Sequence, residues 1–381
     1  MEQFLPPVYD DSISTIGNNL ENSQFQASFS RIARVCKSDT GGPHKFKNKW
    51  TSFLKSRLNC SVPGDTPFYF NEIQATTNFI QDGTDQVLYG VFNTPDNSIA
   101  GSAICAFRLS DITETFEIGP FKNQENTNSN WLPMSKSQIP EPRPGLCNVN
   151  GQNLPERNMN FIKRHSLMDW AVESGTKAPI FTKTSLGERL TVIAADPGVR
   201  SVEGSITDIL FVGTTNGRVL KISSNSNTLI EAFQVFPYHV PVRNLLVSQD
   251  QIIVLSDHEV NAFPLHRCEK IQNCGDCVAL QDPYCAWDLS ERACVAHNQL
   301  KWSGLIQDLE HGYHEGCPLP EPGTVDNFLR KQCLQHIIES LCLKINLKSL
   351  NLQLQSKNIS LINLTEWNLR KIGFDSRAQL G

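Results

Sequence analysis

Short apolar or alternating runs, separated by turns, fill the chain from about residue 29 to residue 265. Such alternation is typical of antiparallel strands, because successive side chains of a strand point to opposite faces of the sheet. The runs with the strongest pattern cover residues 68–70, 87–92, 102–109, 190–194, 209–213, 219–222, 245–247 and 252–255. We therefore expect an all-β fold over this part of the chain.

Two of these stretches resemble each other. Residues 87–90 lead through a Pro95-Asp96-Asn97 turn to residues 103–107, and residues 209–213 lead through Asn216-Gly217 to residues 219–222. Asn-Gly between apolar runs is a strong hairpin signal. When the polar, proline-rich insert at residues 110–173 is left out, the number of residues between the two copies is about that of one propeller blade, which has ~40–50 residues. Two unrelated hairpins of a sandwich would give the same pattern, and repetition alone does not separate the two folds.

The insert and the two ends of the chain lack the apolar alternation of the predicted strands. Prolines 140, 142 and 144 break regular structure in the insert, and residues 160–172 predict a short helix that contains Phe161, Leu167, Trp170 and Ala171. Residues 1–28 form an atypical N-terminal segment, and residues 319–381 are an unassigned tail with apolar residues at helical spacing near its start.

The cysteines point to an oxidising compartment. Six of the twelve fall within fifty residues, and this density is typical of a module too small to be stable by burial alone. They are Cys268, Cys274, Cys277, Cys285, Cys294 and Cys317. Three sequons agree with the secretory route, and Asn59 in Asn59-Cys60-Ser61 is the predicted glycosylation site; the others begin at Asn358 and Asn363.

Targeting signals do not accompany this cysteine pattern. Residues 1–30 lack the continuous apolar core of a secretory signal, and no stretch reaches the ~20 apolar residues of a membrane span. We expect the chain to be incomplete for this reason. The net charge of −5 gives no general reason to expect a nucleic acid as partner, because duplex binding depends on phosphate neutralisation.

A metal or redox site is the alternative reading of the cysteines. Cys274-x-x-Cys277 could be a redox pair or half of a zinc site, and His266, His297 and His311 could supply further ligands. No second CxxC follows, and three structural disulfides account for all six cysteines, so we favour disulfides and predict no metal or cofactor. No GxSxG, HExxH, GxxxxGK[ST] or strand-linked GxGxxG motif is present, so we do not expect an enzyme.

Basic residues concentrate between Arg31 and Arg57. Eight of them stand there with a single acid, Asp39, and with Phe46 and Trp50. The eight are Arg31, Arg34, Lys37, Lys45, Lys47, Lys49, Lys55 and Arg57. Such a stripe can steer an acidic protein or a sulfated glycan. The alternative is a solvated loop whose aromatic residues lie in the core.

Many separate motifs of the chain resemble one known family, and they occur in the same order. They are residues 30–37, Gly41-Gly42-Pro43-His44, residues 50–60, residues 67–74, Gly119-Pro120-Phe121-Lys122, Asn128-Ser129-Asn130-Trp131 and residues 140–145. This part of the sequence resembles the sema domain of semaphorins, and is most similar to the invertebrate transmembrane (class 1) semaphorins. Residues 274–277 and 282–288 look like the PSI module that follows a sema domain.

The resemblance implies a partial seven-bladed sema β-propeller of about four blades at residues 29–265, with residues 110–173 as an extrusion-like insert, and a PSI module at residues 266–318. It implies five disulfides: Cys36–Cys147, Cys60–Cys105, Cys268–Cys285, Cys274–Cys317 and Cys277–Cys294. The three PSI disulfides would each contribute about 3 to 4 kcal/mol by the chain-entropy estimate. Cys333 and Cys342 match nothing in the family.

The resemblance also implies a function. We expect an extracellular or cell-surface guidance ligand that binds a plexin receptor, dimerises through its propeller and clusters receptors by avidity. The loop from Lys37 to Lys49, with the flexible pair Gly41-Gly42, lies where semaphorins present loops to plexin. Its expected contact residues are Lys37, His44, Lys45, Phe46, Lys47 and Lys49.

Other functional readings stay open at this point. A fragment of a plexin-like receptor would also join sema to PSI, although the insert resembles the semaphorin version. The sequence contains no counterpart of a semaphorin's early blades or signal peptide, so we expect an incomplete product. A mis-joined gene product without function is a further interpretation. A partial ring would expose strand edges and favour aggregation.

Overall fold

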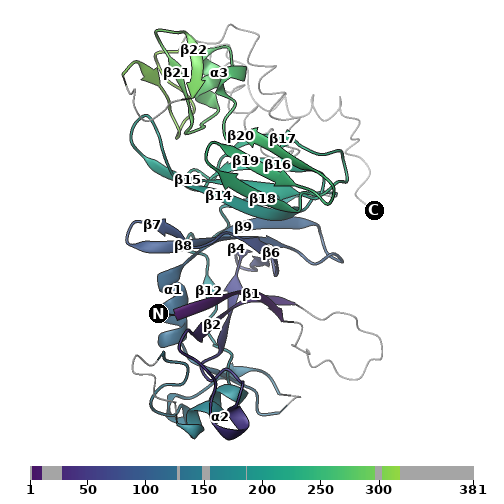
Figure 1. Ribbon diagram of the computed structural model, residues 1–381, viewed down its shortest axis with the longest axis vertical. Coiled ribbons are helices and arrows are strands. Elements are labelled where there is room, and N and C mark those ends of the chain that lie inside the picture. The colour runs from purple at the N-terminus through teal and green to yellow at the C-terminus, as the bar shows by residue number, and fades with distance from the viewer. Residues whose placement is uncertain are drawn as a thin grey trace, which may run out of the picture. The chain divides into compact units, whose positions relative to one another are not determined.

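The computed structural model describes residues 28–126, 129–147, 155–185, 187–296 and 303–317, and the backbone of residues 2–10. In the described part, four sheets of three or more strands precede a small cysteine-rich module (Figure 1). Residues 318–381 lie outside the described part, so Cys333, Cys342, Asn358 and Asn363 do too. In the described part, no helix is both long and apolar enough to cross a bilayer.

The first sheet has the strand order β1-β2-β3-β12. Its strands are β1 (Glu2–Asp10), β2 (Phe29–Cys36), β3 (Leu54–Asn59) and β12 (Val172–Glu173). β2 is buried at seven of its eight positions, and β1 and β3 pair with its two edges. The backbone of β1 pairs antiparallel with β2, a pairing that the sequence of residues 1–28 did not predict. A short hairpin of β4 (Ser61–Val62) and β5 (Phe68–Tyr69) follows β3.

The second and third sheets contain the two predicted hairpins. The second sheet consists of β6 (Glu72–Thr76), β7 (Ile80–Asp82), β8 (Asp85–Asn93), β9 (Gly101–Arg108) and β13 (Phe181–Thr184). The third consists of β14 (Leu190–Arg200), β15 (Ile206–Thr214), β16 (Arg218–Ser223) and β17 (Leu229–Gln234). The pairs β8–β9 and β15–β16 occupy the same central place in their sheets, which makes the repeat one of blades.

The turn between β15 and β16 differs in detail from the prediction. It holds three residues, Thr215 to Gly217, and of these Gly217 has a positive φ of 72°. A Cβ at Gly217 would lie 2.7 Å from the carbonyl oxygen of Phe236. Glycine is therefore required here both by the left-handed backbone and by the close approach of the next segment.

A fourth sheet of three strands completes the series. It consists of β18 (Asn244–Ser248), β19 (Gln251–Leu255) and β20 (Val260–Pro264). The first strand of the third sheet, β14, contacts β6 of the second and β18 of the fourth. Two apolar clusters lie between these sheets, one around Ile104 and Leu210 and the other around Phe211 and Ile252. Sheets joined by their first strands and separated by shared cores form a partial β-propeller.

The insert between β9 and β13 contains more helix than predicted. Its elements are α1 (Leu109–Glu117), β10 (Lys122–Asn123), β11 (Leu132–Pro133), η2 (Lys136–Gln138) and α2 (Glu156–Arg164). The strand prediction to Leu109 and the helix prediction over 160–172 were both wrong at their limits. Leu109, Ile112 and Phe116 share one face of α1 and start a helix instead. α2 begins after Pro155 and ends at Arg164, with Glu156 in its first turn and basic residues in its last, as the helix dipole favours.

The cysteine-rich module folds around its own disulfides. It contains η3 (Cys268–Lys270), α3 (Cys274–Ala279) and a sheet of order β22-β21-β23, formed by β21 (Cys285–Asp288), β22 (Ala293–Ala296) and β23 (Leu305–Ile306). The side chain of Asn273 caps α3 by accepting a 2.8 Å hydrogen bond from the backbone N–H of Asp276. Its core consists of six half-cystines with Val278, Trp287 and Ile306.

Candidate functional site

The loop between β2 and β3 is organised around the carboxylate of Asp39. Its two oxygens accept hydrogen bonds from the backbone N–H groups of Gly41, Thr51 and Ser52. They also accept from the hydroxyls of Thr51 and Ser52, and all five bonds measure 2.6 to 3.0 Å. Burial raises the pKa of Asp39, but these donors outweigh it and leave the pKa below its usual value. The only acid of the basic stripe therefore ties the start of the loop to its end.

Gly41 and Gly42 are closely surrounded, and the flexibility expected of this pair stays a prediction. Gly41 has a φ of +86°, and a Cβ at Gly42 would lie 2.5 Å from the Sδ of Met159 on α2. Phe46 in η1 (His44–Phe46) is only 5% exposed, beneath Gly42. Phe46 thus anchors the loop, and its ring offers no surface to a partner in this structure, in contrast to its expected role as a contact residue.

The remaining expected contact residues lie on the solvent side of this loop. Lys37, His44, Lys45, Lys47 and Lys49 are all exposed. The Nζ of Lys45 lies 2.7 Å from a carboxylate oxygen of Glu156, in the first turn of α2, and this lowers the pKa of Glu156. The structure therefore exposes five of the six residues on one anchored loop.

The basic stripe does not form one surface. Arg34 is fully buried, its Nη2 donates to the carbonyl of Gly145 at 3.0 Å, and its guanidinium lies 5.1 Å from the ring centroid of Phe116. Arg31 is also buried, and Arg57 is half-buried. Arg31 and Arg34 of β2 thus lie in the interior, Lys55 and Arg57 of β3 are half-buried, and only the basic residues of the loop are exposed.

Five disulfides tie the described part of the chain together. Cys36, at the start of the loop, pairs with Cys147 of the insert, and Cys60 pairs with Cys105 between the first two sheets. The module pairs Cys268 with Cys285, Cys274 with Cys317, and Cys277 with Cys294. These are the same pairs that the family resemblance implies. All six sulfurs of the module are used in this way, so no thiolate remains there for the zinc or redox reading.

Asn59 lies at the end of β3, next to the half-cystine Cys60. Its Nδ2 donates a 2.6 Å hydrogen bond to a carboxylate oxygen of Glu173 on β12. N-glycosylation leaves one hydrogen on this nitrogen, so the bond to Glu173 and a glycan are chemically compatible. Glycosylation of Asn59 stays a prediction.

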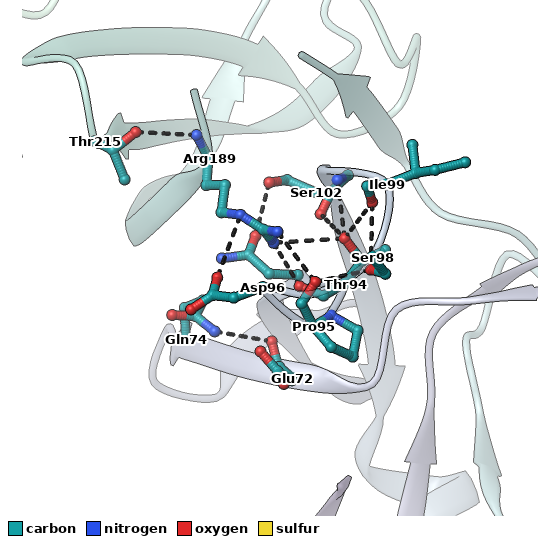
Figure 2. A network of polar contacts seen from close by, with 12 residues as sticks. Glu72, Gln74, Thr94, Pro95, Asp96, Ser98, Ile99, Ser102, Arg189 and Thr215 are labelled. Carbon is teal, nitrogen blue, oxygen red and sulfur yellow. Dashed lines mark hydrogen bonds and ion pairs between the residues drawn. The ribbon is translucent and has the colours of Figure 1, made fainter. Parts of the chain in front are cut away.

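Arg189 joins the second and third sheets, as Figure 2 shows. Its guanidinium reaches into the turn between β8 and β9, where Nη2 donates to the carbonyl of Pro95 at 3.2 Å and Nε lies 3.6 Å from Asp96. Its backbone N–H donates to the hydroxyl of Thr215 at 3.0 Å, in the turn between β15 and β16. One residue thus connects the corresponding turns of two successive blades.

A buried ion pair joins the third sheet to the cysteine-rich module. Lys221 of β16 and Asp282 of the module meet there, and the hydroxyl of Tyr284 donates to the carboxylate of Asp196 on β14. The amide of Gln307 adds a third link, since its oxygen accepts from the backbone N–H of Val202 at 2.8 Å. Burial lowers the pKa of Lys221, although Asp282 opposes this. No local sequence pattern predicted this contact between the third sheet and the module.

Comparison with known proteins assigns both parts of the chain. The Sema domain model matches residues 73–249, and the Plexin repeat model matches residues 267–318. Semaphorin-1A of Schistocerca americana is 48% identical over 316 residues, which cover 77% of this chain. The chain belongs to the semaphorin family. Semaphorin-1A of Drosophila melanogaster is 45% identical over 325 residues, and human Semaphorin-6D is 38% identical over 321.

Solved structures agree with this assignment. Drosophila Semaphorin 1b, extracellular domains 1–2, superposes with a TM-score of 0.70 at 42% identity, over 75% of this semaphorin and 59% of that chain. A chain of the complex of Drosophila Plexin A with Semaphorin 1b matches at 39% identity and a TM-score of 0.71, over 81% of this chain and 64% of that one. A plexin A4 chain matches at 19% identity and a TM-score of 0.53, which shows a shared fold alone. The receptor-fragment reading is therefore not supported.

The match covers only part of the relatives. The aligned residues span 43% of the Schistocerca protein and 36% of Drosophila Semaphorin-1A. This semaphorin thus spans less than half the length of these two relatives. The matched models and relatives carry the names Sema domain, Plexin repeat and semaphorin, and none of these names an enzyme.

Proposed function

We propose that this semaphorin is an extracellular or cell-surface guidance ligand that binds a plexin receptor through the loop from Lys37 to Lys49. The observation that carries the proposal is the anchoring of this loop. The Asp39 network, the buried Phe46 ring and the Cys36–Cys147 disulfide fix its backbone, while four lysines and His44 point to solvent. A fixed loop loses little conformational entropy on binding, so more of its contact energy appears as affinity.

Similarity to a chain of the Plexin A–Semaphorin 1b complex supports plexin as the class of receptor. The charge of the loop supports an acidic surface on that receptor, since exposed charges of one sign mainly accelerate association with a surface of the opposite sign. Axon guidance is the process that we propose for this ligand, because the relatives are semaphorins.

The test is charge reversal at the exposed positions. We expect Lys45→Glu/Lys47→Glu to weaken binding to an immobilised plexin ectodomain at least tenfold, with most of the change in the association rate. The matched control is Lys177→Glu/Lys270→Glu, which changes the net charge equally at residues outside the loop. Unchanged binding by the loop variant, or an equal loss in the control, would remove the loop from the proposed interface.

We further propose that the ligand acts as a homodimer formed through its propeller, so that paired sites cluster receptors. The domain limits proposed with it are 29–265 for the propeller, with the insert at 110–173, and 266–318 for the PSI module. The family matches at 73–249 and 267–318 fall inside these limits. Sedimentation of the purified chain over a range of concentrations tests the dimer, and a single monomeric species throughout would contradict it.

A further inference from the structure

A pocket lies beside the start of β2, between the first sheet and the insert. We call it the basic pocket, and its polar and aromatic walls come from Phe29, Arg31, Arg57, Lys122, Trp131 and Asp169. Its volume is 290 Å³. It is separate from the loop of the proposed function, since Phe29 begins β2 and the loop follows Cys36 at its other end, roughly 20 Å away at the rise of a strand.

Positive charge exceeds negative charge in the basic pocket. Three cations and one carboxylate line it, and the carboxylate of Asp169 lies 3.6 Å from the Nζ of Lys122. Burial lowers the pKa of Arg57, and the nearby charge of Arg31 lowers it further, although Tyr69 and Glu173 oppose this. Like charges in a partly desolvated place destabilise one another, so an anion bound between them is favoured.

Arg57 is held in position before any ligand arrives. Its guanidinium lies between two aromatic rings, 4.5 Å from the centroid of Phe29 and 4.8 Å from that of Tyr69. Its Nη2 donates a 3.0 Å hydrogen bond to the Oδ1 of Asn71, which uses one of the five N–H donors of the group. A preorganised guanidinium binds a planar or tetrahedral oxyanion with little loss of side-chain entropy.

The remaining walls are apolar. Trp131 and Phe29 are half-buried, and the buried residues Leu167 and Met168 also line the pocket. A small concave site with apolar walls and a few fixed charged groups suits one compact ligand unit, whereas a protein surface needs a larger and flatter area. Ring faces next to guanidinium groups suit a sugar ring that carries an anionic substituent.

We propose that the basic pocket binds a sulfated sugar unit of an extracellular glycan. The sulfate oxygens accept hydrogen bonds from Arg57 and Lys122, and the sugar ring lies against Trp131. Because this site and the proposed receptor loop lie at opposite ends of β2, the glycan does not replace the receptor. The proposal therefore goes beyond the proposed function and does not depend on it.

The test uses the full chain and a heparin-derived tetrasaccharide, with binding measured by calorimetry at low ionic strength. Lys122→Gln and Trp131→Ala change side chains that are partly exposed, so folding should be retained; circular dichroism checks this. We expect each to weaken binding about tenfold, because Lys122→Gln removes one charge-assisted contact and Trp131→Ala removes the ring that faces the sugar. The matched control, Lys45→Gln, removes the same charge from the loop and should change binding less than about twofold.

Two further probes decide between ligand classes. The desulfated tetrasaccharide should not bind detectably, because the charge of the sulfate is the main attraction. An oligoglutamate peptide of equal charge should bind at least tenfold more weakly, since it has no ring to lie against Trp131. Any of three results would overturn the proposal. They are equal binding of the peptide, unchanged binding of the tetrasaccharide by both pocket variants, and an equal loss of binding with Lys45→Gln. Lys122→Gln is expected to bind the plexin ectodomain normally. A loss of glycan binding in this variant is thereby distinguished from a loss of receptor binding.

Discussion

The Nζ of Lys221 lies 2.5 Å from the Oδ2 of Asp282, and the two side chains are only 1% and 5% exposed. The ammonium group also donates to the carbonyl of Leu265 at 2.9 Å and lies 4.3 Å from the ring centroid of Tyr284. A lysine charge is accepted in such a place only with partners on several sides. The pair therefore fixes the PSI module to the third blade.

The first prediction concerns this pair. Asp282→Ala leaves the Lys221 ammonium buried without its counter-ion, and should lower the free energy of unfolding by about 3 to 5 kcal/mol. Lys221→Met/Asp282→Ala should cost much less than the sum of the two single changes, as a double-mutant cycle in chemical denaturation would show.

The exposed pair Arg243–Asp257, with Nε and Oδ2 3.1 Å apart, is the matched control. Truncation there should cost less than about 1 kcal/mol, because water screens both charges. Additive effects at Lys221 and Asp282 would contradict the coupling that the short distance implies.

The second prediction concerns the loop that Asp39 organises. Asp39→Asn keeps the shape but replaces an oxygen that accepts hydrogen bonds by an NH₂ group, and should cost about 1 to 3 kcal/mol and make the loop sensitive to protease. Asp65→Asn, at an exposed position, is the control. Limited proteolysis and thermal unfolding are the measurements.

The effect of Asp39 should depend on pH. Its folded pKa lies below the ordinary value of 3.8, so the stabilisation is fully present above that value and is lost as pH falls through the lower folded pKa. The stability difference between the original chain and Asp39→Asn should therefore shrink below about pH 3.8. A difference that stays constant down to strongly acid pH would show that the carboxylate does not carry the effect.

The third prediction concerns Arg189. Arg189→Gln removes the guanidinium contacts to Pro95 and Asp96, and should lower stability by about 1 to 3 kcal/mol, since a partly buried carbonyl loses its donor. Arg200→Gln at an exposed position of the same strand region should change stability by less than about 0.5 kcal/mol. Equal melting temperatures for the two variants would mean that Arg189 does not hold the blades together.

The fourth prediction concerns the disulfides. Peptide mapping without reduction should recover five linked pairs among Cys36 to Cys317, with Cys274 joined to Cys317. Cys274→Ser/Cys317→Ser should destabilise the PSI module by about 3 to 4 kcal/mol. Titration of six free thiols in the native module would contradict the pairing and reopen the metal reading.

Much of the fold could be predicted because it depends on local pattern. The alternation in residues 87–92 and 209–213 identified the central strands, and the family resemblance implied a partial propeller, which the sheets and the comparisons confirm. Limits of helices were less predictable. The strand β9 and the helix α1 meet at Arg108 and Leu109, where the apolar period changes from two to about three and a half within a few residues.

The site was less predictable, because burial is decided by distant segments. Closeness in the sequence grouped Arg31, Arg34 and Phe46 with the loop lysines, yet all three are buried, and the Arg34 guanidinium donates to the carbonyl of Gly145 in the insert. Lys221 carried a readable signal, since it occupies the same strand face as the buried Val219. A lysine on an inward face indicates a buried partner, but nothing local identifies Asp282 as that partner.

Adjacent residues of β15 in the third sheet pack against different sheets. Leu210 and Val212 pack toward the second sheet, whereas Ile209 and Phe211 pack toward the fourth. An insertion of one residue in β15 would exchange these two sets and misdirect both at once. Length differences among relatives should therefore accumulate in the turns, such as residues 224–228 between β16 and β17, and the strands between them should keep constant length.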